Sequence, residues 1–147
     1  MRSLGDRLGV KHSKIQRSLE RLAAAGLYDS NRRQAIPHAV EEFVEHALKY
    51  LHPIAPGPIV RGIPTAWAAL PLSEEIQSSD LPPVWPDPLG VVRGQAVAPL
   101  DECLLTLVDS WPEVTQFAVL ADAIRLGDAR SRAAAVEHVR ILIRAAG

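Results

Sequence analysis

The chain has 147 residues, 48% of them apolar, which suits one ordinary domain or a small module joined to a helical body. No apolar run approaches the roughly 18 residues of a membrane-spanning helix, and the early charges argue against a signal peptide. Although the net charge is −1, residues 1–36 hold eight Lys/Arg against three Asp/Glu, and the remainder holds eight against fourteen. A basic start on an acidic body favours a polyanionic partner for the start, with ordinary solvated charge as the alternative.

The chain has a single cysteine, Cys103. One cysteine excludes an internal disulfide and a cysteine-cluster metal site, and it is compatible with a reducing cytosol. We therefore expect a cytoplasmic protein. The apolar neighbours Leu104 and Leu105 favour a buried small side chain over a nucleophile.

The first predicted elements are two helices joined by a glycine. Ser3 is placed to cap a helix over residues 4–8, which Gly9 ends, because glycine suits the positive φ of a tight turn. A second helix is expected from about Ser13, whose hydroxyl would cap it, to Gly26. Helix, glycine turn and helix at this spacing are typical of a helix-turn-helix, whose second helix enters the major groove of DNA.

The second helix is predicted to be amphipathic. Its apolar stripe recurs at intervals of four and three residues and consists of Ile15, Leu19 and Leu22. The residues that we expect near base edges are Ser13, Gln16 and Arg17, since Gln can pair with adenine and Arg with guanine. Those better placed for phosphates are Lys11, Lys14 and Arg21. The alternative is a surface helix with an ordinary polar face.

Residues 4–27, LGDRLGVKHSKIQRSLERLAAAGL, resemble the second and third helices of bacterial winged helix-turn-helix regulators of the MarR-like kind. Residues 61–72, RGIPTAWAALPL, resemble a segment that follows such a head in poorly characterised regulators of that kind. The resemblance implies a sequence-specific, usually dimeric DNA-binding transcriptional regulator. It assigns base recognition to Ser13, Gln16 and Arg17, and DNA backbone contacts to Lys11, Lys14 and Arg21.

The sequence departs from that pattern in two places. A winged head normally has a helix before the turn unit, whereas only Met1 and Arg2 precede it here. Either the true start lies upstream or another part of the chain fills that place. The segment YDSNRRQAIP leaves room for only a short wing, in which Arg32 and Arg33 are candidate backbone contacts.

Residues 38–52 form the clearest helical pattern. Its apolar positions follow the i, i+3, i+4, i+7 rule and are Val40, Phe43, Val44, Ala47, Leu48 and Leu51. We expect this helix, with Pro37 in its first turn, to cover the apolar stripe of the head or to pair with its copy in a dimer. His38, Glu42 and His46, beside Glu45, have a spacing that can ligate zinc, but a polar helix face gathers such residues by default, and we expect no metal.

Ten of the twelve prolines fall between Pro53 and Pro99, which excludes a long helix there. The segment is apolar, so we expect it to be packed rather than disordered. A Pro-Asp-Pro-Leu-Gly turn between residues 84–85 and 91–97 predicts a β-hairpin. This hairpin, which carries Arg93, would either supply the missing wing or, more simply, cap the core.

The last third is predicted to be helical, with a capping box of Ser110 and Glu113. The buried positions expected in its helices are Leu104, Leu105, Leu107, Val108, Phe117, Leu120, Ala121, Ile124, Val136, Val139, Leu142 and Ile143. Gly127 should end one helix and Asp128 cap the next. Arg125, Arg130 and Arg132 would hold a phosphate or, more simply, lie in a solvated turn.

These patterns predict a mainly α protein in three parts. They are a shortened winged helix-turn-helix head with its following helix (residues 1–52), a Pro-rich segment with a hairpin (53–99) and C-terminal helices (100–147); two separable domains meeting near residue 75 are the rival architecture. We expect a homodimer that binds double-stranded DNA, with no cofactor and no catalytic residues, because the motifs of phosphate loops, nucleophile elbows and dinucleotide sites are missing. The alternative is an antitoxin-like or adaptor module that holds a second protein.

Overall fold

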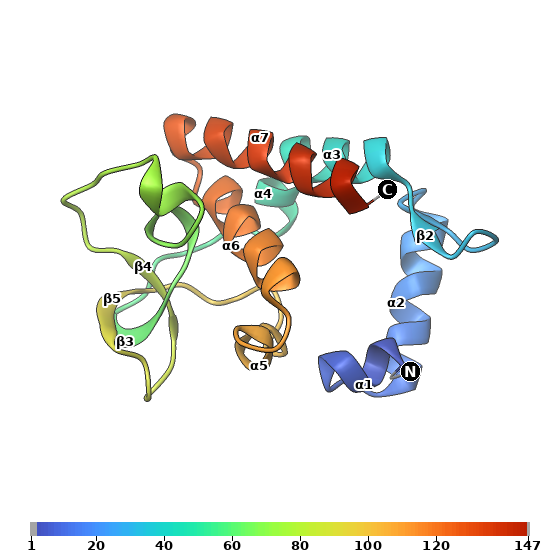
Figure 1. Ribbon diagram of the computed structural model, residues 1–147, viewed down its shortest axis with the longest axis horizontal. Coiled ribbons are helices and arrows are strands. Elements are labelled where there is room, and N and C mark those ends of the chain that lie inside the picture. The colour runs from blue at the N-terminus through green and yellow to red at the C-terminus, as the bar shows by residue number, and fades with distance from the viewer. Residues whose placement is uncertain (1–2, 147) are drawn as a thin grey trace.

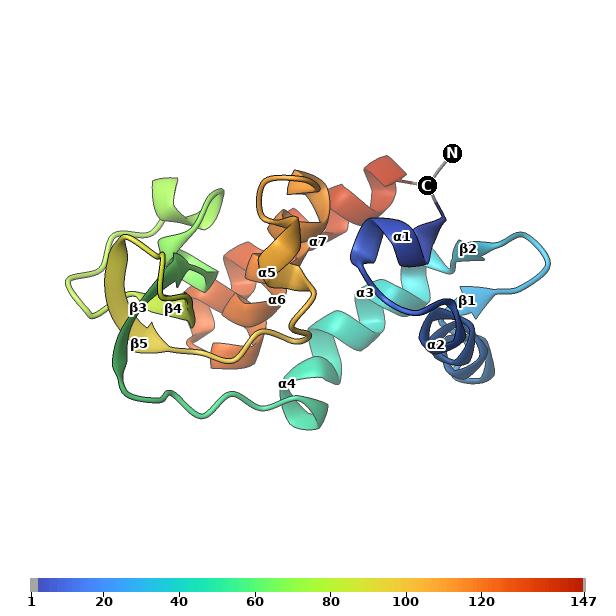
Figure 2. The same ribbon diagram turned by 90° about the horizontal axis from the view of Figure 1, so that it is seen from below.

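The computed structural model describes residues 3–146 (Figure 1). Helix is the dominant secondary structure, and the strands in this range form one two-stranded sheet and one small closed barrel. The molecule is elongated, with the N-terminal helices and the two-stranded sheet at one end and the barrel at the other (Figures 1 and 2). The remaining helices lie between them, so the mainly α prediction is confirmed at this level.

The N-terminal helices are α1 (Leu4–Leu8) and α2 (His12–Ala24). The predicted cap of α1 is confirmed: the Ser3 hydroxyl accepts the backbone N–H of Asp6 at 3.2 Å, and the Asp6 carboxylate accepts that of Ser3 at 3.3 Å. Gly9 adopts φ 67° and ends α1 as predicted. The predicted cap at Ser13 is wrong. Because α2 begins at His12, Lys11 holds the N-cap position and Ser13 already lies in the first turn.

A short antiparallel hairpin follows α2, formed by β1 (Tyr28–Asp29) and β2 (Gln34–Ala35). The Asp29 carboxylate accepts the backbone N–H groups of Asn31 and Arg32 at 2.9 and 3.1 Å, a local bond pattern that stabilises a turn. A short hairpin therefore lies directly after the second helix, where the sequence leaves room for a short wing.

The helix predicted over residues 38–52 is present as α3 (Pro37–His46) and α4 (Leu48–Leu51), interrupted at Ala47. The expectation that it covers the stripe of α2 is wrong, because Val44 and Leu48 are instead buried in the core formed with α6 and α7. Those two helices contribute seven buried residues to this core, whereas α2 has none. As a result, every residue of α2 keeps some exposure, and Leu22 is 40% exposed.

The Pro-rich segment is packed as predicted, with Leu72, Val84 and Trp85 fully buried. Its elements are β3 (Ile59–Pro64), the 3₁₀ helices η1 (Ala66–Ala68) and η2 (Leu72–Glu74), β4 (Pro83–Pro86) and β5 (Val92–Ala96).

The predicted hairpin between β4 and β5 is wrong. The two strands run parallel, and each pairs antiparallel with β3, so the three strands close into a barrel. The closure passes through Gly62, which pairs with both Pro86 and Val92. A Cβ on Gly62 would lie only 2.1 Å from the carbonyl oxygen of Trp85, so glycine is what permits this approach. β5 lies at the end of the molecule away from α2 (Figures 1 and 2), so Arg93 does not supply a wing.

The C-terminal helices are α5 (Leu104–Leu107), α6 (Pro112–Leu126) and α7 (Ala129–Ala146). The predicted capping box at the start of α6 is wrong: the Ser110 hydroxyl donates back to the Thr106 carbonyl at 3.2 Å, and Trp111 takes the N-cap position. The end of α6 is as predicted, with Gly127 at φ 85°. The Asp128 carboxylate accepts the Ser131 N–H at 2.9 Å and so caps α7.

The main core is formed by α3, α4, η1, η2, α6 and α7 together. The predicted positions Leu120, Ala121 and Ile124 are fully buried, and Val136 and Val139 are buried on α7. A second cluster lies between the barrel and α5, where Trp85, Leu104, Leu107, Ala118 and Val119 pack together. Residues 118–124 of α6 are all buried. Ala118 and Val119 belong to the second cluster and Leu120 and Ile124 to the main core, so α6 packs against both.

Candidate nucleic-acid interface

The side chains predicted to contact DNA lie on α2 and on the turn between β1 and β2, and all of them are exposed: Lys11, Ser13, Lys14, Gln16, Arg17, Arg21, Arg32 and Arg33. α2 is held at its angle to α1 by the Gly9 turn and by a close approach at Gly5, where a Cβ would lie 2.7 Å from the Val10 carbonyl oxygen. The local sequence thus fixes the direction in which this basic helix points.

The predicted residues of α2 divide between two faces. Lys14, Arg17 and Arg21 are spaced by three and four residues and so share one face. Gln16 precedes Arg17 by one residue, which places it about 100° around the helix. Ser13, Lys14 and Arg17 line a cavity of about 400 Å³, whereas Gln16 lies outside it. The structure therefore brings Arg17 together with Lys14 and Ser13 and separates Gln16 from them.

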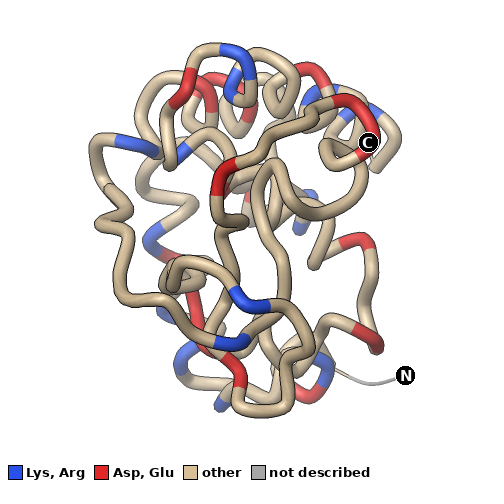
Figure 3. The backbone as a smooth tube through the Cα atoms, turned by 90° about the vertical axis from the view of Figure 1, so that its left-hand side faces the viewer, with Lys and Arg blue, Asp and Glu red and all other residues tan. Residues whose placement is uncertain are grey.

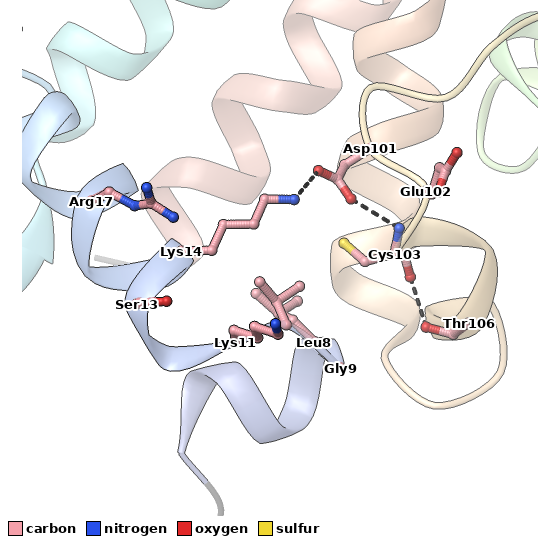
Figure 4. A pocket seen from close by; sticks show the side chains of 11 residues that line it. Leu8, Gly9, Lys11, Ser13, Lys14, Arg17, Asp101, Glu102, Cys103 and Thr106 are labelled. Atoms are coloured by element: carbon pink, nitrogen blue, oxygen red, sulfur yellow. Dashed lines mark hydrogen bonds and ion pairs between the residues drawn. The ribbon is translucent and has the colours of Figure 1, made fainter.

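The opposite wall of this cavity belongs to the start of α5, which sequence reasoning did not place near the head. Asp101, Glu102, Cys103 and Thr106 line it (Figure 4). Lys14 Nζ donates to Asp101 Oδ2 at 3.2 Å, and Asp101 Oδ1 accepts the backbone N–H of Cys103 at 3.0 Å. The Lys14 bond therefore connects one face of the basic helix with this acidic turn of the body, while the Cys103 bond holds the Asp101 carboxylate within the turn.

Hydrogen bonding and burial shift the pKa values of two side chains in this wall, Asp101 and Cys103. The backbone hydrogen bond from Cys103, helped by Lys14, lowers the pKa of Asp101 below its ordinary value of 3.8. Partial burial, with Asp101 nearby, raises the pKa of the Cys103 thiol. Cys103 is half-buried rather than fully buried as predicted. Its raised pKa keeps the thiol protonated and a poor nucleophile.

The two arginines of the hairpin turn lie apart from this cavity. Arg32 Nε lies 3.9 Å from Asp29 Oδ2, and Arg33 adopts φ 55°. Both side chains are exposed. Their assignment as DNA backbone contacts stays a prediction.

A buried polar cluster, which sequence reasoning missed, joins α6 to the barrel. The fully buried Asp122 accepts hydrogen bonds from Thr65 Oγ1 at 2.6 Å, from Trp85 Nε1 at 2.7 Å and from Arg125 at 2.7 Å. Burial raises the pKa of Asp122, and these three donors oppose that shift. The available signal was an Asp followed by an Arg three residues later inside an otherwise apolar run.

The three arginines that we considered for phosphate binding have different surroundings. Arg125 is almost fully buried, and its Nε donates to the His52 carbonyl at 2.8 Å. Arg132 donates to the Glu45 carbonyl at 2.7 Å. Only Arg130 of the three is exposed in the described chain. Both suggestions, a phosphate site and a solvated turn, are therefore wrong for Arg125 and Arg132, because these side chains hold backbone segments together.

The suggested metal ligands on α3 are not gathered into one site. Glu45 accepts from Arg140 at 2.8 Å, and its carboxylate lies 3.9 Å from the ring of His46. His38 and Glu42 are exposed. Within residues 3–146, no group of three or more His, Cys, Asp or Glu side chains is arranged to hold a metal ion.

A second cavity, of about 710 Å³, lies between strand β2 and the helices α3, α6 and α7. It is predominantly apolar and is lined by Gln34, Ala35, Pro37, Val40, Glu113, Val114, Phe117, Leu142, Ile143, Ala145 and Ala146. Leu142 and Ile143, which were predicted to be buried or to form a dimer contact, are half-buried at its wall. We call this cavity the apolar groove.

Charge is not separated over the rest of the molecule. Seen from the barrel side, acidic and basic positions are interspersed (Figure 3). Across residues 3–146, no helix is both long enough and apolar enough to span a membrane. No family model, curated protein or solved structure matches the chain.

Proposed function

We propose that this chain is a DNA-binding transcriptional regulator of the winged helix-turn-helix type, which reads the major groove through α2. The observation that carries the proposal is the order of elements at the N-terminus: α1, a left-handed Gly9, an exposed basic α2 and a short hairpin with two arginines in its turn. This order supplies a helix for the groove and basic side chains on either side of it.

The roles proposed for individual residues follow from their chemistry and their exposure. Arg17 can donate two hydrogen bonds to guanine, and Gln16 can pair with adenine. The Ser13 hydroxyl can form a hydrogen bond with either base. Lys11, Lys14, Arg21, Arg32 and Arg33 supply charge for the phosphates. Gln16 and Arg17 lie on different sides of α2, so they would reach neighbouring bases rather than the same one.

The test is a selection of bound sequences from random DNA duplexes, carried out with the wild type, with Arg17→Ala and with Arg130→Ala as the matched control. Arg130 is exposed at the start of α7, so its loss changes the net charge equally without touching α2. Arg17→Ala should weaken the best site by about 1–3 kcal/mol and relax the preference at one base pair. The absence of any enriched sequence, together with no binding to bulk DNA at low salt, would refute the proposal.

A homodimer is part of this proposal, because major-groove readers commonly place two copies on two-fold related half-sites. The exposed Leu22 of the α2 stripe and the apolar groove both leave apolar surface available for a second copy. Light scattering at micromolar concentration measures the mass directly. A monomer there would remove the dimer and leave single-site DNA binding.

A second candidate function, favoured by the apolar groove, is an antitoxin-like or adaptor module that holds another protein. A contiguous apolar groove is a common feature of surfaces that receive a partner's helix. Val114→Lys places a charge in this groove, and Val91→Lys, at a side chain that is 94% exposed, is the control. A stoichiometric protein partner that Val114→Lys alone releases, with no DNA retained, would favour this function over the first.

A further inference from the structure

The basic face of α2 is turned toward the acidic start of α5 rather than away from the molecule. Lys11, Lys14 and Arg17 form one wall of the 400 Å³ cavity, and Asp101 and Glu102 form part of the other. In Figure 4, the Lys14 side chain reaches across the cavity to Asp101. The face that would meet DNA therefore faces a pair of adjacent carboxylates of the same chain.

Three contacts hold the head in this position. Lys14 pairs with Asp101, the Arg7 guanidinium lies 3.5 Å from the centroid of the Trp111 ring, and Leu8 packs against the apolar cluster around α5. These contacts use an ion pair, a cation–π interaction and apolar burial. We call this set of contacts the latch.

The Asp101 carboxylate is fixed in place as well as charged. Its Oδ1 accepts the Cys103 N–H at 3.0 Å while its Oδ2 faces Lys14. Glu102 adds a second, exposed carboxylate beside it. A DNA phosphate approaching Lys14 would meet the Asp101 charge, whose Oδ2 lies 3.2 Å from Nζ, well within the Debye length of about 8 Å at physiological salt.

We propose that the latch is an autoinhibitory contact, in which Asp101 occupies the place on Lys14 that a DNA phosphate would take. This inference rests on the proposed DNA-binding function and adds its regulation. Helix α5 stands beside the reading face of α2, where the sugar-phosphate backbone bordering a major groove would run. DNA therefore binds only when the head moves away from α5 and Lys14 exchanges a carboxylate for a phosphate.

The latch is weak enough for DNA to open it. The side chains of Lys14 and Asp101 are 56% and 45% exposed, and exposed ion pairs contribute little and are screened by salt. A dense row of phosphates offers Lys14, Arg17 and Arg21 several partners at once. The contact thus lowers the affinity for DNA of any sequence without abolishing it.

The test compares Asp101→Asn with the wild type and with Asp80→Asn in binding to a random-sequence duplex at low salt. Asparagine keeps the oxygen that accepts the Cys103 N–H, so the local turn is retained, and circular dichroism verifies the fold. Asp80 is exposed in the Pro-rich segment, and its replacement by asparagine changes the net charge by the same amount. We expect Asp101→Asn to bind about threefold to fivefold tighter, with Asp80→Asn near the wild type and the difference shrinking as salt rises.

The outcomes separate this inference from the function on which it rests. If the wild type binds DNA and the two variants bind alike, autoinhibition is wrong and DNA binding stands. If none of the three binds DNA at any salt concentration, the proposed function fails and the inference fails with it.

A second measurement reports the opening itself. Cys103 is half-buried in the wall of this cavity, opposite Lys14, so its labelling by a thiol reagent should accelerate several-fold when a DNA duplex is added to the wild type. Lys14→Gln should also accelerate labelling without DNA, even though the loss of a nearby positive charge raises the pKa of the thiol. Labelling that slows or stays constant in both cases would overturn the proposed opening.

Discussion

Asp122 is an ionisable residue that is fully buried. It lies within α6, where it receives hydrogen bonds from Thr65, Trp85 and Arg125. Arg125 in turn donates to the carbonyls of His52 and Ala98. One carboxylate therefore connects α6 with the barrel and with both of the loops that lead into and out of it.

Replacing Asp122 with alanine should destabilise the fold severely. The change leaves a buried indole N–H, a hydroxyl and a guanidinium without their acceptor, and the loss of one partner from a buried charged network costs about 3–5 kcal/mol. Urea denaturation measures the free energy of unfolding. Asp109→Ala, at an exposed carboxylate, should stay within about 0.5 kcal/mol of the wild type, and a similarly small effect at Asp122 would contradict the assigned network.

At the scale of elements, the barrel depends on close backbone approach. A Cβ on Gly62 would lie 2.1 Å from the Trp85 carbonyl oxygen, and a Cβ on Gly94 would lie 2.1 Å from the Pro82 carbonyl oxygen. Both positions are in contact with backbone, which cannot move aside as a flexible side chain can. The three strands close because two of them have no side chain where they meet their neighbours.

Gly62→Ala should therefore cost about 3 kcal/mol or more, at or beyond the upper end of overpacking effects. Gly57→Ala is the matched control, because its Cβ would meet only the Ala96 side chain, at 3.3 Å, and Ala96 backbone at 3.5 Å. We expect a cost of under about 1 kcal/mol there. The comparison uses thermal unfolding of both variants, and equal melting temperatures would show that the barrel relaxes around the added methyl group.

The elements that sequence reasoning identified are those with local signals. The predicted helix starts and ends that the structure confirms depend on residues only a few positions away, and they lie at Ser3, Gly9, Pro37, Gly127 and Asp128. Two local predictions are wrong, the cap at Ser13 and the capping box of Ser110 and Glu113. The other errors and omissions concern which distant segments meet. Three features depend on residues far apart in sequence: the pairing of β4 with β5, the surface covered by α3 and the closeness of Lys14 to Asp101. Local spacing carries no information on which distant surfaces pack together.

The candidate site divides in the same way. The exposure of the predicted DNA contacts follows from the period of α2, so the polar face could be read directly. The acidic wall opposite that face could not, since it comes from a turn 87 residues later in the chain. The cluster around Asp122 combines partners 57 and 37 residues away and was inaccessible for the same reason.

At the scale of the whole molecule, the body and the head differ in how firmly they are held. The main core includes residues from α3 and α4, from the Pro-rich segment and from α6 and α7. The α2 helix contributes no buried residue of its own. The head is attached through the chain at Ile36 and through the latch, whereas the elements of the body are joined by the main core and by the second cluster between the barrel and α5.

Hydrogen exchange should reveal this difference. Amides of α2 should exchange at free energies well below the global value, because few buried contacts oppose local opening, whereas amides of residues 118–124 in α6 should exchange only on global unfolding. Mass spectrometry of peptic peptides measures both segments in one experiment. Equal protection of α2 and α6 would show that the head unfolds only with the core.

Limited proteolysis tests the division of the body. Because η1 and η2 pack into the same core as α6, a cut in the exposed stretch between residues 77 and 80 should leave both fragments associated under native conditions. Size-exclusion chromatography of the cut protein checks this. Fragments that separate and remain folded would support two domains meeting near residue 75.

The placement of α6 and α7 at the end of the described chain has a consequence for synthesis on the ribosome. The apolar faces of α3, η1 and η2 are synthesised before their covering partners Leu120, Ile124 and Val139. The nascent chain therefore carries exposed apolar surface until these partners follow, the condition under which chains aggregate or recruit chaperones. We expect the body to fold only once α6 and α7 have left the exit tunnel.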